Sequence, residues 1–172
     1  MRKSTAKKVA LYGVLTALAL VLSWLEAQIP AFFAVPGLKL GLTNIVVLLA
    51  LYCIGPKSAL AVNGVRILLV SFLFGNGISL LYSLVGGMLS TVIMILLKKT
   101  GKFRIVTVSI AGGISHNVGQ ILTAMVLLQT ANLAWYLLIL WFAGLAAGAA
   151  VGLIGAVLCS RLKKFLAEGG QS

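Results

Sequence analysis

The stretch "SHNVGQI" (115–121) lies inside an apolar run, residues 105–129, that is long enough to cross a lipid bilayer. It places His116, Asn117 and Gln120 close together in sequence. A bilayer helix needs about 20 mostly apolar residues, and polar side chains inside one must face protein, water or a ligand. The stretch therefore raises two questions: whether residues 105–129 cross a membrane, and whether these three polar side chains form a binding site.

The composition indicates an integral membrane protein. Of the 172 residues, 61% are hydrophobic and 9% are charged, and the mean hydropathy is +1.14. An average soluble domain is about half apolar and about a quarter charged. We predict an all-α integral membrane protein with one domain over residues 1–172 and six transmembrane helices, at residues 9–28, 38–54, 58–75, 78–97, 105–129 and 133–159.

The basic residues predict the orientation. The net charge is +12, and of the 14 basic residues only Lys39 and Arg66 lie outside the chain ends and two gaps between the apolar segments. Basic residues concentrate on the cytoplasmic side of membrane proteins. We therefore expect both termini in the cytoplasm. The same rule accounts for the basic excess without nucleic acid as a partner.

The connection "IPAFFAVPGLKLG" (29–41) is apolar but contains two prolines, so it is not a regular helix throughout. Non-helical backbone at the membrane edge is tolerated only against protein or a watery cavity. Two interpretations stay open. The connection is either a loop whose Phe32 and Phe33 enter the interface, or a lid over an outward-facing pocket.

Catalytic equipment is scarce in this sequence. Asp is absent, and the acidic residues are Glu26 and Glu168. The chain has no phosphate-binding loop motif, and its single His has no acid beside it for a metal site. Cys53 and Cys159 read as packing residues. We expect no catalytic residue, no metal and no cofactor, and hence no enzyme acting alone.

A sparse set of polar residues is predicted at membrane depth. Arg66 lies near the middle of its segment and needs a partner, which is either a structural contact or the anion of a substrate. Glu26 lies nearer the outer end of its own segment, which disfavours a direct pair. Gln120 shares a helix face with both His116 and Asn117. This face either makes interhelical hydrogen bonds or forms a binding wall. The candidate substrate-binding residues are Glu26, Lys39, Asn63, Arg66, His116, Asn117 and Gln120.

Small residues recur at helical spacing in three segments. Such stripes let helix backbones approach closely, so internal packing is the first interpretation and docking of another membrane subunit is the second. The stripes are Gly144, Gly148 and Gly152; Ser79, Ser83, Gly87 and Thr91; and Ala6, Ala10, Gly13 and Ala17.

Three blocks carry a resemblance to a known family: "VPGLKLGLTNIVVLLAL" (35–51), "RILLVSFLFG" (66–75) and "SIAGGISHNVGQI" (109–121). They resemble heptaprenyl diphosphate synthase component I, a family also called Gx transporters. The first name implies an accessory subunit of a two-part prenyltransferase. The second implies kinship with the substrate-binding S components of energy-coupling-factor transporters, which are small six-helix proteins. These dock through small residues of the first helix, which here would be Ala6, Ala10, Gly13 and Ala17, with Val14 interrupting the pattern.

Two functions follow as hypotheses for a multi-pass protein of a bacterial plasma membrane. The main one is an S-component-like subunit that binds a small-molecule solute and works with a transmembrane coupling subunit and an ATPase pair. The alternative is a noncatalytic accessory subunit of heptaprenyl diphosphate synthase, with a prenyltransferase as partner. An autonomous secondary transporter is less favoured, because acids for proton or sodium coupling are missing.

Overall fold

The protein folds as an all-α bundle, as the composition predicts. The computed structural model describes residues 2–28, 41–75 and 77–168, and no strand occurs within these ranges. In chain order the helices are α1 (Arg2–Gln28), α2 (Asn44–Leu49), the π-helix η1 (Ala50–Ile54), α3 (Pro56–Phe74), α4 (Gly77–Lys99), α5 (Ile105–Leu128), the 3-10 helix η2 (Ala131–Leu133) and α6 (Ala134–Glu168).

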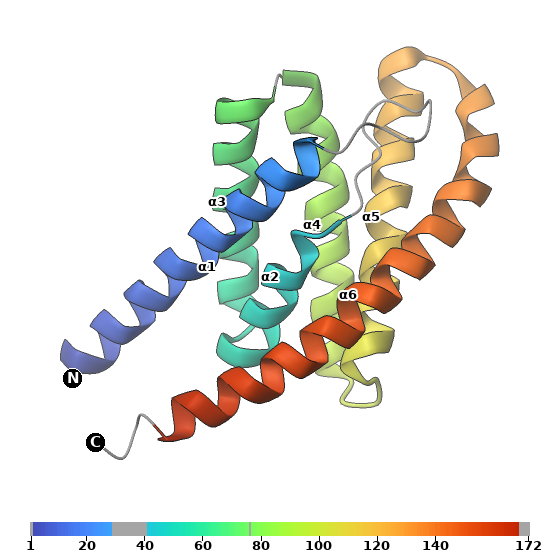
Figure 1. Cartoon of the computed structure of the whole chain (residues 1–172). Helices are drawn as coiled ribbons and strands as arrows, with labels where there is room; N and C mark the ends of the chain where they lie inside the picture. Colours follow the sequence, from blue (N-terminus) through green and yellow to red (C-terminus); the bar gives the residue numbers. More distant parts are fainter. Residues whose placement is uncertain (1, 29–40, 76, 169–172) are drawn as a thin grey trace.

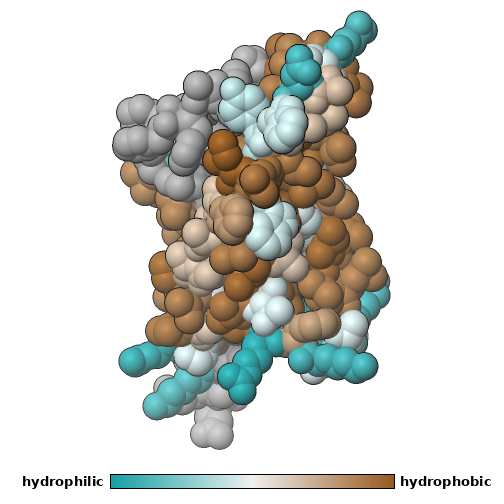
Figure 2. All heavy atoms as spheres, turned by 90° about the vertical axis from the view of Figure 1, so that its right-hand side faces the viewer, coloured by the Kyte–Doolittle hydropathy of each residue, from teal (hydrophilic) through white to brown (hydrophobic). Residues whose placement is uncertain are grey.

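Five of the described helices, α1, α3, α4, α5 and α6, are long and apolar enough to cross a membrane. They form an up-and-down array, and the start of α1 and the end of α6 lie at the same end of the bundle (Figure 1). Hydrophobic side chains cover the middle of the face in Figure 2, with hydrophilic ones toward its ends. Large apolar side chains such as Phe72 and Trp135 are exposed by 89% and 84%. A lipid bilayer is the solvent that fits such a surface.

The second helix is shorter than the predicted span at residues 38–54. The backbone turns at Gly41, where φ is +77°, and the helical residues run only from Asn44 to Ile54. Most of α2 is buried, and together with η1 it contacts α3 and α6. Its apolar residues therefore face protein instead of lipid, so hydropathy alone could not distinguish this inner helix from a span. The predicted lid, except for its last residue Gly41, falls on residues 29–40, which include Lys39 and lie outside the described residues.

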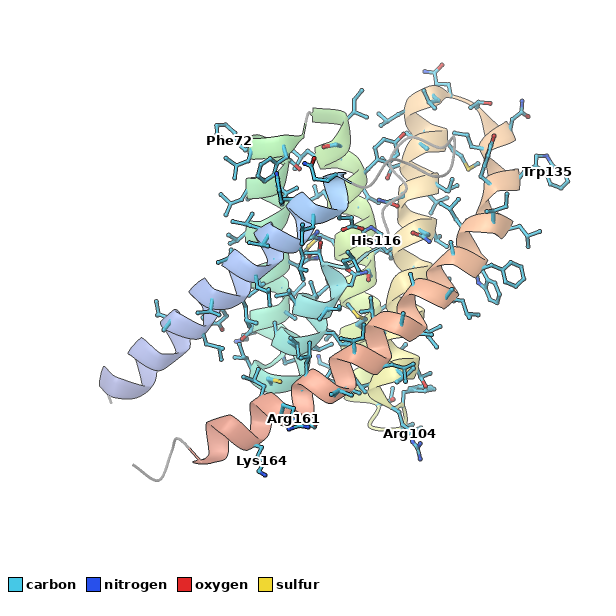
Figure 3. All side chains as sticks on the ribbon, in the orientation of Figure 1. Phe72, Arg104, His116, Trp135, Arg161 and Lys164 are labelled. Atoms are coloured by element: carbon cyan, nitrogen blue, oxygen red, sulfur yellow. The ribbon has the colours of Figure 1, made fainter. Side chains whose placement is uncertain are left out.

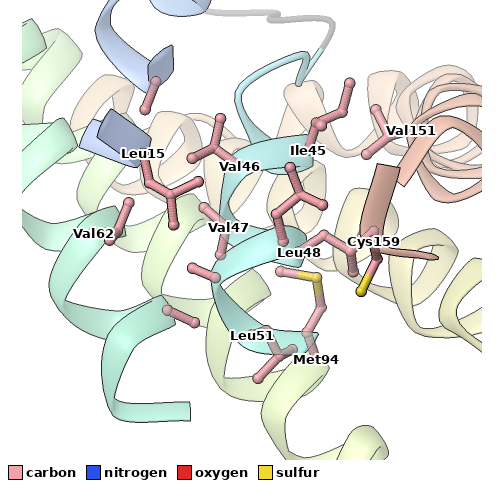
Figure 4. Packing of buried hydrophobic residues seen from close by; sticks show 14 of the residues in the cluster. Leu15, Ile45, Val46, Val47, Leu48, Leu51, Val62, Met94, Val151 and Cys159 are labelled. Atoms are coloured by element: carbon pink, nitrogen blue, oxygen red, sulfur yellow. The ribbon is translucent and has the colours of Figure 1, made fainter. Parts of the chain in front are cut away.

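The core is built around α2. Val46, Leu48 and Leu51 are fully buried, and side chains from α1, α3, α4 and α6 surround them (Figure 4). Helix α2 thus fills the space that α1, α3, α4 and α6 surround.

The glycine stripe of α6 packs against α5, which confirms internal packing as its role. A Cβ added at Gly148 would lie 2.7 Å from Ile110 Cα and 2.9 Å from Ser109 O, both on the α5 backbone. At Gly152 it would lie 2.8 Å from Val106 Cα. The two helices approach so closely because these residues lack side chains.

Candidate functional site

The polar residues of α3 form a hydrogen-bonded cluster with α4. Arg66 donates from Nε and Nη2 to Asn63 Oδ1, over 3.2 and 2.7 Å. Asn63 Nδ2 donates in turn to Gly87 O and Thr91 Oγ1, over 3.0 and 2.8 Å. Thr91 Oγ1 donates to Gly87 O over 2.8 Å. The cluster therefore anchors Arg66 to the backbone of α4 through a single amide.

The charge of Arg66 has no carboxylate in contact within the described residues. Arg66 is 7% exposed, and Glu26 lies within electrostatic range but forms no ion pair with it. A guanidinium carries five N–H donors on three nitrogens, and Asn63 serves only two of those nitrogens. A buried positive charge of this kind favours an anion beside it.

Glu26 forms hydrogen bonds with the residues that precede α2. Its carboxylate accepts from the Gly41 N–H and, over 3.2 Å, from Thr43 Oγ1. Ser23 Oγ also lies 3.1 Å from Thr43 Oγ1. These contacts attach the end of α1 to the turn that leads into α2, and they give Glu26 a structural task.

The polar residues of α5 face the interior of the bundle. His116, Asn117 and Gln120 are 6%, 5% and 4% exposed. Figure 3 places His116 well inside the bundle, away from Arg104, Arg161 and Lys164 at its basic end. Asn117 Nδ2 donates to Leu140 O of α6 over 2.7 Å, which is the interhelical hydrogen bonding that the sequence offered as one interpretation.

Gln120 differs from Asn117, its neighbour on α5. Both atoms of its amide are buried and lack a hydrogen-bond partner within the part of the chain that the structure describes. A buried polar group left unsatisfied costs about 1–3 kcal/mol. Gln120 is therefore the residue of α5 that favours a bound polar group most directly.

The two polar sets lie on either side of a glycine pair in α4. A Cβ at Gly86 would lie 3.0 Å from Gln120 Cγ and 3.4 Å from His116 Cε1. A Cβ at Gly87 would lie 3.3 Å from Asn63 Nδ2 and 3.5 Å from Arg66 Nη2. Adjacent residues of one helix thus bring the α3 and α5 sets to the same depth of the bundle. We call the residues that meet at this pair the inner polar site: Asn63, Arg66, Thr91, His116 and Gln120.

Sequence reasoning missed three contributors to these contacts. Gly86 was overlooked, although the "GG" pair within an apolar segment signals a close backbone approach. Thr91 was recognised as a small residue and not as a hydrogen-bond partner of Asn63. Thr43 was missed as the partner of Glu26, because no local pattern links residues on different helices.

The remaining predicted site residues lie on or near α1. Ala10, Gly13 and Ala17 are exposed, and a Cβ at Gly13 would meet nothing within 4 Å. The side chain of Ala6 and all of Lys39 lie outside the described part of the chain. Within the described residues no three His, Cys, Asp or Glu side chains gather in a way that could hold a metal ion.

These features define a helical membrane protein with a polar site inside its bundle. The family model described as "Heptaprenyl diphosphate synthase component I" matches residues 15–158. The chain therefore belongs to the heptaprenyl diphosphate synthase component I family. No curated protein and no solved structure matches it.

Proposed function

We propose that this chain is a noncatalytic accessory subunit of heptaprenyl diphosphate synthase in a bacterial plasma membrane, and that its partner is a separate prenyltransferase. Its family membership supports this function. The absence of Asp from the sequence supports a noncatalytic role, because magnesium-dependent prenyl transfer needs a cluster of acidic ligands and the acidic residues of this chain are Glu26 and Glu168 alone. The chemistry would belong to the partner.

The observation that carries the proposal is the buried charge of Arg66. It lies at membrane depth with hydrogen bonds to Asn63 and no carboxylate in contact among the described residues. A prenyl diphosphate combines an anionic head with an apolar chain that dissolves in the bilayer. Arg66 would hold the head, because guanidinium donors form strong charge-assisted hydrogen bonds with phosphate oxygens. Gln120 Nε2 would add a donor.

Binding of farnesyl diphosphate to the purified protein in lipid nanodiscs tests this proposal, with farnesol as the matched control. We expect saturable binding of the diphosphate. Charge-assisted hydrogen bonds contribute about 1.5–3 kcal/mol, so farnesol should bind at least about tenfold more weakly. Equal binding of the two compounds, or no binding of the diphosphate, would count against a site for the anionic head.

A second function is favoured by one observation on α1. Ala10, Gly13 and Ala17 are small and exposed on this helix, with the exposed side chain of Val14 between them. Small residues allow the close approach of another membrane helix. This arrangement suits an S-component-like subunit that docks on a transmembrane coupling subunit with an ATPase pair, and that binds an anionic solute at the inner polar site.

The substitution Ala10→Leu tests which of the two proposed functions is correct. If α1 docks on a coupling subunit, the larger side chain should prevent close helix contact, and a tagged variant should no longer recover that subunit from solubilised membranes. Ala61→Leu, at an exposed position of α3, is the matched control and should leave recovery unchanged. If the Ala10→Leu variant still recovers the coupling subunit as well as the wild-type protein does, the chain does not dock through this face of α1.

A further inference from the structure

Two cysteines from distant parts of the chain meet at one end of the core. Cys53 of η1 and Cys159 of α6 are 106 residues apart in sequence, and their sulfur atoms are 3.0 Å apart. They are not joined by a disulfide. Because a disulfide bond is about 2.05 Å long, its formation needs an approach of only about 1 Å. Sequence spacing alone assigned both residues to packing.

We infer that Cys53 and Cys159 form a peroxide-oxidisable thiol pair that reversibly links η1 to α6. Cys53 is partly exposed, whereas Cys159 is 4% exposed. This difference assigns the order of reaction, because an oxidant reaches the more accessible sulfur first. Cys53 is then the attacking residue and Cys159 is the resolving residue.

The reaction balances with hydrogen peroxide as the oxidant. The Cys53 thiolate attacks one peroxide oxygen, which breaks the O–O bond and gives a sulfenic acid and hydroxide. The Cys159 thiolate then attacks the sulfenic sulfur, forms the S–S bond and displaces hydroxide. Overall, two thiols and one peroxide yield one disulfide and two waters. A dithiol reductant reverses the oxidation by exchange.

The surroundings place the pair near water at the basic end of the bundle. Next to Cys53 in sequence, the Tyr52 ring has Lys98 Nζ 4.8 Å from its centroid, and Lys98 Nζ donates to Leu51 O over 2.5 Å. A charged amine at a helix end extends to the membrane–water boundary. The orientation predicted from the basic residues puts this end in the cytoplasm. Disulfides in that reducing compartment are mostly transient and sensing, which suits a reversible pair.

The link would join two parts of the core. η1 continues α2, which fills the centre of the bundle, and Cys159 belongs to the same buried cluster as Leu48 and Met94 (Figure 4). A covalent bond here closes a long loop and reduces the entropy of the unfolded chain. Oxidation should therefore raise the melting temperature and hold α6 against η1.

The test uses the purified full-length protein in detergent. After treatment with hydrogen peroxide and quenching, the denatured chain is labelled with a maleimide-linked polyethylene glycol and separated by gel electrophoresis. We expect the monomer to lose both adducts together and to regain both after dithiothreitol. Peptide mass spectrometry should identify the link between Cys53 and Cys159. In Cys159→Ser, dimedone should trap a sulfenic acid on Cys53.

Three results would overturn the inference. One is that both thiols of the wild-type protein remain labelled after peroxide. Another is that disulfides form only between separate chains. The third is that Cys53→Ser loses its remaining adduct as fast as the wild-type protein does. Because the wild-type labelling and the peptide analysis need no variant, a substitution that fails to fold leaves the test decisive.

Discussion

Replacing Arg66 by methionine is expected to weaken the binding of farnesyl diphosphate at least about tenfold while leaving the bundle folded. Methionine fills similar space without charge. It leaves Asn63 Oδ1 without its donor, which costs about 1–3 kcal/mol, less than the about 5–15 kcal/mol by which folded proteins are usually stable. Loss of charge-assisted hydrogen bonds worth about 1.5–3 kcal/mol weakens binding at least about tenfold. Titration of the ligand into nanodisc-embedded protein measures the affinity, and the unfolding temperature measures the fold.

Two control variants show whether the effect is specific to Arg66 and whether it depends on the charge or on the arrangement of the N–H donors. Lys57→Met removes a basic side chain from an exposed position of the same helix and should leave the affinity unchanged. Arg66→Lys keeps the charge but loses the planar donor arrangement, so its affinity should fall between those of the wild type and Arg66→Met. If Arg66→Met binds as tightly as the wild-type protein, Arg66 does not hold the ligand.

The second large effect is expected at the contact between α5 and α6. Gly148→Ala introduces a Cβ 2.7 Å from Ile110 Cα, and because that neighbour is backbone, the helices must move apart. Overpacking of this kind costs about 1–3 kcal/mol. Unfolding in sodium dodecyl sulfate should show a corresponding decrease in the free energy of unfolding.

Gly64→Ala is the matched control for Gly148→Ala. A Cβ at Gly64 in α3 would meet nothing within 4 Å, so the same chemical change meets no obstacle there. The higher helix propensity of alanine should leave stability unchanged or raise it by up to about 1 kcal/mol. Equal decreases for the two variants would mean that the close approach of α5 and α6 does not limit stability.

Much of the fold could be predicted because the bilayer restricts a chain so strongly. Inside lipid, backbone groups must bond within helices, so hydropathy alone predicts helices close to those at 56–74, 77–99 and 105–128. Glycine spacing in α6 also predicted close packing. The second helix was predicted to span residues 38–54 but runs from Asn44 to Ile54. Hydropathy could not show this, because an apolar helix buried in protein has the same composition as one that faces lipid.

Less of the inner polar site could be predicted. The sequence suggested Arg66, Asn63 and Gln120, because strong hydrogen-bonding side chains are rare at membrane depth. It did not show that Asn63 links Arg66 to Thr91, since such partners depend on which helices become neighbours. The contact between Cys53 and Cys159 was missed for the same reason.

Recovery of the tagged protein from its native membrane in mild detergent, followed by mass spectrometry of the proteins that accompany it, tests the central claim most directly. The proposed accessory role predicts recovery of a prenyltransferase without an ATPase pair. Recovery of an ATPase pair and a transmembrane coupling subunit, with no prenyltransferase, would contradict that role and establish the transporter subunit instead.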